Sequence, residues 1–190
     1  MTPEQYLEME RAAEFKSEYF EGQVYAMAGG TYPHATIIAN VGRELGQALK
    51  QKPCTVTGSD ARLRISPAGL CTYPDVMVVC GEAKFADDQR DTLLNPTLIV
   101  EVLSKSTEGH DRGFKFVQYR KLDSLREYVL VSTGEPRVEK FLRQQDGQWL
   151  LSESVGLDAV CRFESLECQV LVSDIYHRVT LGDEPVGAPA

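Results

Sequence analysis

The pattern of apolar and polar positions divides the chain into helix-like and strand-like segments. Between His34 and Lys50, apolar residues recur every three or four positions, which predicts an amphipathic helix. Two later segments, 73–80 and 97–104, read YPDVMVVC and TLIVEVLS and are almost continuously apolar. Runs rich in Val and Ile are typical of strands that are covered on both faces. We therefore expect these two segments at the centre of a sheet.

Weaker signals place further elements around this centre. A cap residue, a proline and acidic residues predict a short helix that begins after Thr2. Glu21-Gly22 separates two β-prone runs, which predicts a hairpin over 16–27. The other predicted elements are a strand over 54–65, a helix over 113–122, strands over 127–132, 137–143 and 149–154, and a strand end or short helix over 170–177. This order predicts an α/β fold in which helices cover the sheet.

Composition indicates one globular domain. The chain has 190 residues, of which 43% are hydrophobic and 25% charged, and this is close to average usage. We expect a single domain over 1–181 and a flexible tail over 182–190. No segment approaches the roughly 18 apolar residues of a membrane span, and the first residues lack the pattern of a signal peptide. A cytoplasmic location without membrane contact is expected.

The charge balance restricts the kinds of surface that the protein can have. Twenty Lys and Arg residues stand against 28 Asp and Glu residues, so the net charge is −8. This balance argues against a surface that binds nucleic acid or anionic membranes over its whole extent, but a local basic groove remains compatible with it.

The cysteines and histidines carry little metal or disulfide signal. Five cysteines form no C-x-x-C pair and are odd in number, which favours reduced thiols over a disulfide framework. The three histidines are far apart in the sequence, so a zinc site is not expected.

Two acids interrupt the apolar runs. Asp75 lies in YPDV and Glu101 lies in IVEVL, and buried carboxylates are costly unless they are paired or bind a cation. Alternation along neighbouring strands allows both acids to project to one spot. One interpretation places each acid at a strand end, where it is solvated or paired. The other is a shared cation, and oxygen ligands without clustered His or Cys favour Mg²⁺ or Mn²⁺.

A polar triplet follows the second apolar run. Asp111, Lys115 and Tyr119 stand at i, i+4 and i+8, so they share one helix face, which can be a solvated face with an Asp–Lys pair. The position of the triplet favours a functional interpretation. About 10 Å of strand separates Glu101 from Ser104, and about 6 Å of antiparallel helix leads back. The Lys115 ammonium can therefore reach the region of Glu101.

These motifs together resemble those of a known family. Tyr73-Pro74-Asp75, Glu101 within IVEVLSKST, and the spaced Asp111, Lys115 and Tyr119 resemble the Uma-type restriction-endonuclease family, a branch of the PD-(D/E)XK nuclease superfamily. The segment SEYFEGQV at 17–24 and a histidine at the start of the long helix also fit, so the similarity covers roughly residues 1–180.

The resemblance implies a restriction-endonuclease-like core with a central mixed β-sheet flanked by helices. It implies that Asp75 and Glu101 bind Mg²⁺ or Mn²⁺, which activates water for attack on a phosphodiester bond of DNA. The superfamily usually has a lysine two residues after the glutamate, where this chain has Leu103. In this branch the lysine is expected on the following helix, which nominates Lys115 as the catalytic cation. Lys105, in the loop between, is a weaker candidate.

Four further residues are secondary candidates. Glu18 is either a surface charge of the hairpin or an additional ligand for metal or water. His34 either caps or packs at the start of its helix, or it orients a ligand. Asp111 and Tyr119 are expected to position Lys115 from the same helix face.

The distribution of charge along the chain indicates what kind of substrate can approach the predicted site. Residues 105–126 carry six basic and three acidic side chains, a local excess of +3, whereas residues 1–22 carry two basic and six acidic ones. A phosphate-bearing substrate is therefore expected to approach the side of the predicted site, with weak and salt-sensitive binding. A homodimer is expected from the class alone, because nucleases that cut both strands often pair.

A second function is compatible with the same residues. Leu103 and the acidic total favour a nuclease-fold module that binds nucleic acid or protein and has little or no catalytic activity. Metal-dependent cleavage separates the two hypotheses.

Overall fold

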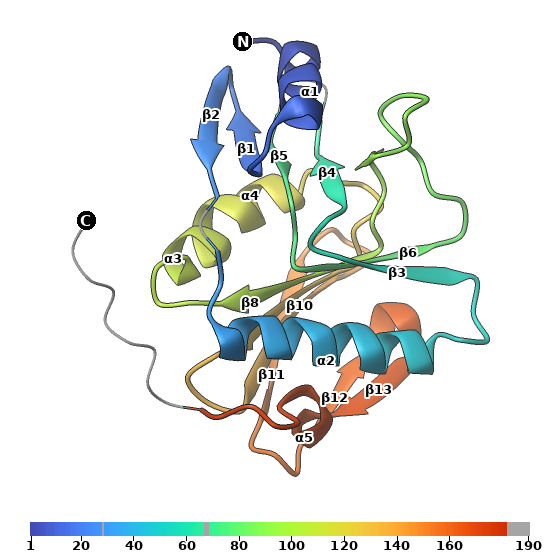
Figure 1. The fold of residues 1–190 in the computed structure, drawn as a ribbon. Helices are drawn as coiled ribbons and strands as arrows, with labels where there is room; N and C mark the ends of the chain where they lie inside the picture. The colour runs from blue at the N-terminus through green and yellow to red at the C-terminus, as the bar shows by residue number, and fades with distance from the viewer. Residues whose placement is uncertain (28, 67–68, 182–190) are drawn as a thin grey trace.

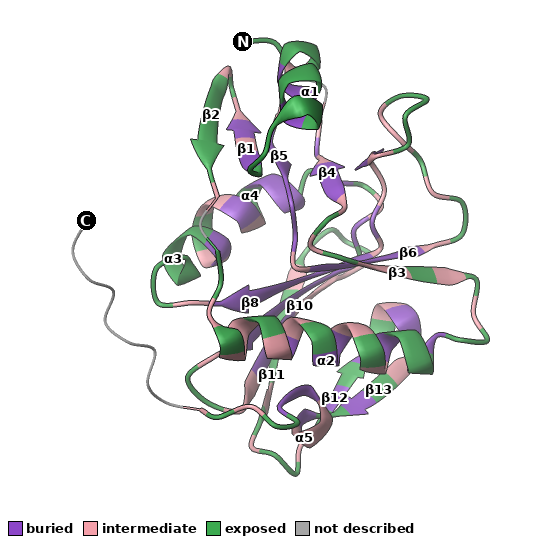
Figure 2. Ribbon diagram, in the orientation of Figure 1, coloured by how far each residue is buried: buried purple, intermediate pink, exposed green. Residues whose placement is uncertain are grey.

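The two apolar runs lie at the centre of a six-stranded mixed sheet (Figure 1). A computed structural model describes residues 1–27, 29–66 and 69–181, so the predicted tail lies outside the described residues. The strand order is β11-β10-β9-β8-β6-β3, and β8 and β9 are parallel. The strands are β3 (Cys54–Gly58), β6 (Val76–Cys80), β8 (Leu98–Leu103), β9 (Glu127–Ser132), β10 (Arg137–Arg143) and β11 (Trp149–Val155). Every residue of β8 is buried, which confirms its central place (Figure 2).

Helices cover the first face of this sheet. The predicted long helix is α2 (Tyr32–Ala48), and its apolar residues Ile37, Val41 and Leu45 are buried against the strands. The same apolar layer includes residues of the C-terminal elements. These are β12 (Val160–Phe163), η2 (Glu164–Leu166), β13 (Cys168–Leu171) and α5 (Val172–Ile175). The sequence predicted β13 and α5 together as one segment but missed β12.

A broken helix and a smaller sheet cover the second face. The helix consists of α3 (Glu108–His110), the π-helical turn η1 (Asp111–Lys115) and α4 (Phe116–Tyr119). It begins five residues before the predicted start. The hydroxyls of Ser104 and Thr107 hydrogen-bond each other at 3.0 Å and form a tight turn, so the helix can start directly after Thr107.

The smaller sheet has the order β2-β1-β5-β4-β7. Its strands are β1 (Ser17–Phe20), β2 (Gln23–Ala26), β4 (Arg62–Arg64), β5 (Cys71–Thr72) and β7 (Thr92–Leu93), and α1 (Pro3–Ala12) packs beside β1. The predicted hairpin is confirmed: Glu21 and Gly22 both have positive φ, 45° and 89°, as a two-residue turn between twisted strands requires.

One predicted strand is divided between the two sheets. The segment 54–65 forms β3 in the large sheet and β4 in the small one. The chain turns between them at Ser59-Asp60, where the Ala61 amide donates to the carbonyl of Gly58 at 3.2 Å. The continuous-strand prediction was wrong because Gly, Ser and Asp together favour a turn.

The expectation of reduced thiols was wrong for one pair. Cys54 of β3 lies opposite Cys80 of β6 in the strand register, and a disulfide joins them. Cys71, Cys161 and Cys168 are free. Spacing along the chain could not reveal this bond, since it depends on which strands pair. Among the described residues, no helix has the length and apolar character needed to cross a membrane.

Candidate active site

The strand register brings the two interrupting acids together. Asp75 directly precedes β6, and Glu101 lies within β8. Because Val76 pairs with Val100 in antiparallel register, the position before Val76 lies opposite Glu101. The Val102 amide donates to Oδ2 of Asp75 at 2.7 Å, and the Asp75 amide donates to Oε2 of Glu101 at 3.4 Å. The predicted meeting of the two carboxylates is therefore observed, although Asp75 lies before its strand rather than inside it.

The carboxylate of Glu101 is buried and accepts hydrogen bonds from two side chains. Oε1 accepts a hydrogen bond from the Tyr119 hydroxyl at 2.6 Å and one from the Lys115 ammonium at 3.2 Å. Burial raises the pKa of Glu101 to about 8, with Lys115 opposing this shift and the Asp75 carboxylate adding to it. Glu101 thus keeps its proton to a higher pH than a free carboxylate does, even beside the Lys115 ammonium.

This raised pKa predicts a pH-dependent stability of the metal-free protein. The unfolded chain releases the Glu101 proton near pH 4.5 and the folded protein near pH 8, so the folding contribution of Glu101 is lost as the pH rises between these values. We expect Glu101→Gln to exceed wild type in free energy of unfolding by up to about 5 kcal/mol at pH 8.5, and to match it near pH 4.5. Urea unfolding in EDTA at the two pH values measures this difference. Parallel pH profiles for both proteins would contradict it.

Lys115 lies at the centre of a group of acids. Its ammonium lies 3.2 Å from Oε1 of Glu101, 3.1 Å from Oδ1 of Asp111 and 3.8 Å from Oε1 of Glu18. Burial alone would lower the pKa of Lys115, but these carboxylates outweigh it and raise the pKa above its usual value. Lys115 is therefore a charged donor inside the site. Asp111 contacts Lys115 directly, whereas Tyr119 acts on it through Glu101.

Glu18 reaches the site from the hairpin. The Thr72 hydroxyl of β5 donates to Oε1 of Glu18, and Oε2 lies 3.9 Å from Nε2 of His110. Its side chain is only 14% exposed. Glu18 is thus a cleft residue rather than a surface charge of the hairpin.

His34 lies against Asp75 at the start of α2. Its Nε2 is 3.5 Å from Oδ2 of Asp75. Burial by itself would lower the pKa of His34, but the Asp75 carboxylate and the nearby Val102 backbone raise it overall. The chain approaches this ring so closely that a Cβ at Gly30 would lie 2.5 Å from Nδ1 of His34. Glycine at position 30 is therefore needed for the observed position of the ring.

One cleft of about 760 Å³ lies between the hairpin, the start of α2 and the broken helix, and its lining includes Glu18, His34, Asp75, Glu101, Asp111 and Lys115. Lys105 also lines it, from the exposed loop after β8. The basic excess of 105–126 is not concentrated here, because only Lys105 and Lys115 of its six cations line the cleft. Arg112, for example, pairs with Glu108 and Glu139. The prediction of a basic site face was wrong in this respect.

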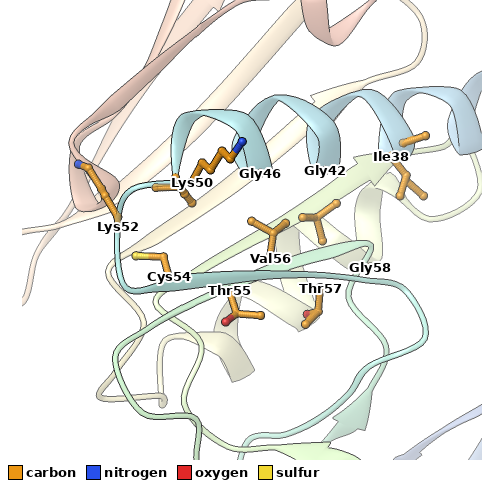
Figure 3. A pocket seen from close by; sticks show the side chains of 13 residues that line it. Ile38, Gly42, Gly46, Lys50, Lys52, Cys54, Thr55, Val56, Thr57 and Gly58 are labelled. Carbon is orange, nitrogen blue, oxygen red and sulfur yellow. The ribbon is translucent and has the colours of Figure 1, made fainter.

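A second hollow lies between α2 and the edge strand β3 (Figure 3). It measures about 610 Å³, and its lining includes Gly42, Gly46, Lys50 and Val56. No Asp, Glu or His is among the described residues that line it, so it offers no acid–base pair. The chemistry of the protein is therefore concentrated in the cleft at Asp75 and Glu101.

Comparison with known proteins identifies the family. The sequence profile of the Uma2 family, described as "Putative restriction endonuclease", matches residues 3–170. The chain belongs to the Uma2 family. Among its relatives is the uncharacterized protein sll1609 of Synechocystis, 36% identical over 88% of this chain and 94% of that protein. A second is the uncharacterized protein slr1290 of the same organism, 37% identical over 93% of this chain and 91% of that protein.

A solved structure supports the fold of this Uma2 protein. A crystal structure described as a putative nuclease from Anabaena variabilis superposes with a TM-score of 0.74, at 18% identity, over 93% of this chain and 97% of that one. The restriction-endonuclease-like α/β fold is thus confirmed. Membership in Uma2 supports a nuclease function for the chain.

The candidate site departs from the usual superfamily pattern in the position of its lysine. Leu103 stands where that lysine is expected, and it is buried in the apolar layer that also holds Tyr119 and Tyr128. Lys115 instead places its ammonium beside Glu101 from the neighbouring helix. A cation thus lies beside Glu101, but it comes from the broken helix and not from position 103.

The two acids of the candidate site, Asp75 and Glu101, fit the ligand set of Mg²⁺. Hydrogen bonds hold Asp75 through Oδ2 and Glu101 mainly through Oε1. In the described part of the chain, no three His, Cys, Asp or Glu side chains are grouped to hold a metal. Two carboxylates nevertheless fit Mg²⁺, which commonly takes one or two carboxylates and fills its other positions with water and phosphate oxygens.

The sequence analysis did not single out His110, a histidine that lines the cleft. Its ring stacks on Phe114, four residues further along the helix, with centroids 4.9 Å apart. The i, i+4 spacing of two rings was the available signal.

Proposed function

We propose that this protein is a metal-dependent endonuclease that hydrolyses phosphodiester bonds of DNA with Mg²⁺ or Mn²⁺. The observation that supports this most directly is the cluster of Asp75, Glu101 and Lys115 inside one cleft. Two oxygen ligands beside a buried ammonium match the needs of phosphoryl chemistry, which requires a cation site and a donor for developing negative charge.

Each residue of the cluster has a distinct part in this proposal. Asp75 and Glu101 would hold the cation, which when bound activates water and stabilises charge on the phosphate. Tyr119 fixes the rotamer of Glu101 by its hydrogen bond to Oε1. Lys115 donates to the phosphate oxygens or orients the water.

Neighbouring side chains hold Asp75 and Lys115 in position. Asp111 and Glu18 hold Lys115 in its charged form and in its position. His34 contacts Asp75 and orients that carboxylate toward Glu101. Hydrolysis adds the oxygen of water to phosphorus and breaks one phosphorus–oxygen bond. The Lys115 ammonium beside the phosphate can stabilise negative charge while the first bond forms and while the second breaks.

A second candidate is a nuclease-fold module that binds nucleic acid or protein without appreciable cleavage. The observation that favours it is the charge of the cleft, where Glu18, Asp75, Glu101 and Asp111 stand against Lys105 and Lys115. Without metal, these acids weaken the attraction to a phosphate chain, which favours a protein partner over nucleic acid for such a module.

Plasmid cleavage separates the two proposals. We expect purified protein to nick or linearise supercoiled plasmid in Mg²⁺ or Mn²⁺ but not in EDTA, and Asp75→Ala to abolish this activity. Chromatography with light scattering of the same preparation tests the homodimer that we propose for cutting both strands. Binding to nucleic acid without cleavage in either metal would reject the enzyme and favour the module.

A further inference from the structure

A short series of aromatic rings leads from the hairpin into the cleft. Phe20 of β1 contacts Phe114 of η1 edge to face, with ring centroids 4.8 Å apart and planes at 89°. Phe114 in turn stacks on His110 of α3, with centroids 4.9 Å apart and planes at 27°. Phe20 and Phe114 thus pack against each other where the hairpin meets the helix. Stacking on Phe114 fixes the plane of the His110 ring.

His110 is the end of this series, and it lies in the cleft. Its side chain lines the same space as Asp75 and Glu101 and is 45% exposed. Phe114 stacks on one face of the ring. Because the side chain is partly exposed and lines the cleft, part of the ring remains accessible to a ligand there. The 3.9 Å contact between Nε2 and Oε2 of Glu18 limits rotation of the ring. An aromatic ring that is fixed on one side and accessible in part can bind a second flat ring.

The carboxylates of the proposed phosphodiester site lie deep within this cleft. The side chains of Asp75 and Glu101 are only 15% and 3% exposed. A phosphate must therefore enter the cleft to reach them. The volume of about 760 Å³ is within the range of pockets for small ligands, roughly 300–1,000 Å³. One strand with a splayed base fits such a space more readily than a paired duplex, whose second strand must stay outside.

The negative charge of the protein also favours a contact with nucleic acid that does not depend on electrostatic attraction. The protein carries a net charge of −8, and the cleft itself contains four acids. Attraction to phosphates supplies most of the affinity in non-specific nucleic-acid binding, and it is weak here. Stacking of bases on aromatic side chains is tolerant of sequence and independent of net charge.

We propose that His110 is a stacking platform for an unpaired nucleobase next to the scissile phosphate, so that the preferred substrate is single-stranded or frayed nucleic acid. This inference rests on the proposed nuclease function and adds the substrate class to it. The alternative is that His110 contacts Glu18 only to hold the hairpin against the helix.

Binding of a fluorescent strand tests the inference without cleavage. The probe is a single-stranded DNA oligonucleotide that contains 2-aminopurine, whose fluorescence is quenched by stacking, and EDTA prevents cutting. We expect His110→Ala to raise the dissociation constant by about 5- to 100-fold and to remove the quenching. His110→Phe should retain both, because it keeps an aromatic ring. The same strand in a blunt duplex should bind more weakly to wild type. Its fluorescence, which stacking within the duplex already quenches, should not fall further when protein is added.

The controls distinguish stacking from a structural role. His177→Ala removes an exposed histidine that is not among the residues lining the cleft, and it should bind like wild type. If His110→Ala binds the strand like wild type, the inference is wrong. Equal weakening in His110→Ala and His110→Phe, with a lower unfolding temperature in both, would show a structural contact with Glu18 instead.

The same measurements distinguish failure of the stacking proposal from failure of the nuclease proposal. Plasmid cleavage by wild type together with unchanged strand binding by His110→Ala would overturn the stacking platform alone. If wild type neither cleaves plasmid nor binds the strand, the nuclease function and the stacking platform are both rejected.

Discussion

Asp75→Asn is expected to lose both metal binding and cleavage while keeping the fold. The asparagine oxygen can still accept the hydrogen bond from the Val102 amide that Oδ2 of Asp75 accepts at 2.7 Å. The negative charge disappears, and with it half of the carboxylate pair that would hold the cation. A metal ion contributes several kcal/mol to a phosphoryl transition state, so cleavage should fall by about 10³-fold or more. Glu101→Gln should behave in the same way.

Calorimetric titration with Mn²⁺ and thermal unfolding measure the two halves of this prediction. The affinity for Mn²⁺ should be lost, whereas the unfolding temperature in EDTA should stay the same or rise, because the repulsion between the two carboxylates is relieved. Asp158→Asn is a matched control, since Asp158 is an exposed acid that is not among the residues lining the cleft. Unchanged Mn²⁺ affinity in both Asp75→Asn and Glu101→Gln would exclude the proposed metal site.

The sequence predicted the centre of the fold well because the signal there is local. β9 and β10 have the predicted bounds, and β8 has them to within one residue at each end. The two acids could be found for the same reason. A carboxylate within an apolar run is conspicuous, and the period of two along a strand limits where it can point.

Features that depend on the pairing of distant segments could not be predicted in this way. Glu18 faces the cleft only because the hairpin joins the smaller sheet, where the Thr72 hydroxyl contacts its carboxylate. The disulfide requires Cys54 and Cys80 to be opposite each other in two strands. The basic excess of the helix is partly cancelled by Glu139 of β10, which pairs with Arg112. None of these contacts leaves a pattern in a short window of sequence.

Lys115 is a residue for which sequence and structure agree on position, and its role can be measured. Its ammonium lies 3.2 Å from Oε1 of Glu101, as the sequence predicted. The superfamily usually has its lysine two residues after the glutamate. In this chain that residue is Leu103, so Lys115 is the buried donor available to the phosphate. Loss of one donor of this kind lowers turnover by about 10²–10³-fold. We expect Lys115→Met to show this loss and to retain binding of Mn²⁺.

Two further variants separate this role from general effects of charge. Lys115→Arg keeps a cation among the same acids and should recover part of the activity. Lys105→Met removes the exposed lysine of the cleft and should change turnover little, because that side chain lies in solvent rather than against Glu101. Single-turnover cleavage of one oligonucleotide by all variants, at a pH where unfolding curves show each of them folded, gives the comparison. If Lys105→Met is the damaging change and Lys115→Met cleaves like wild type, the loop lysine is the catalytic cation and the buried one only neutralises Asp111 and Glu101.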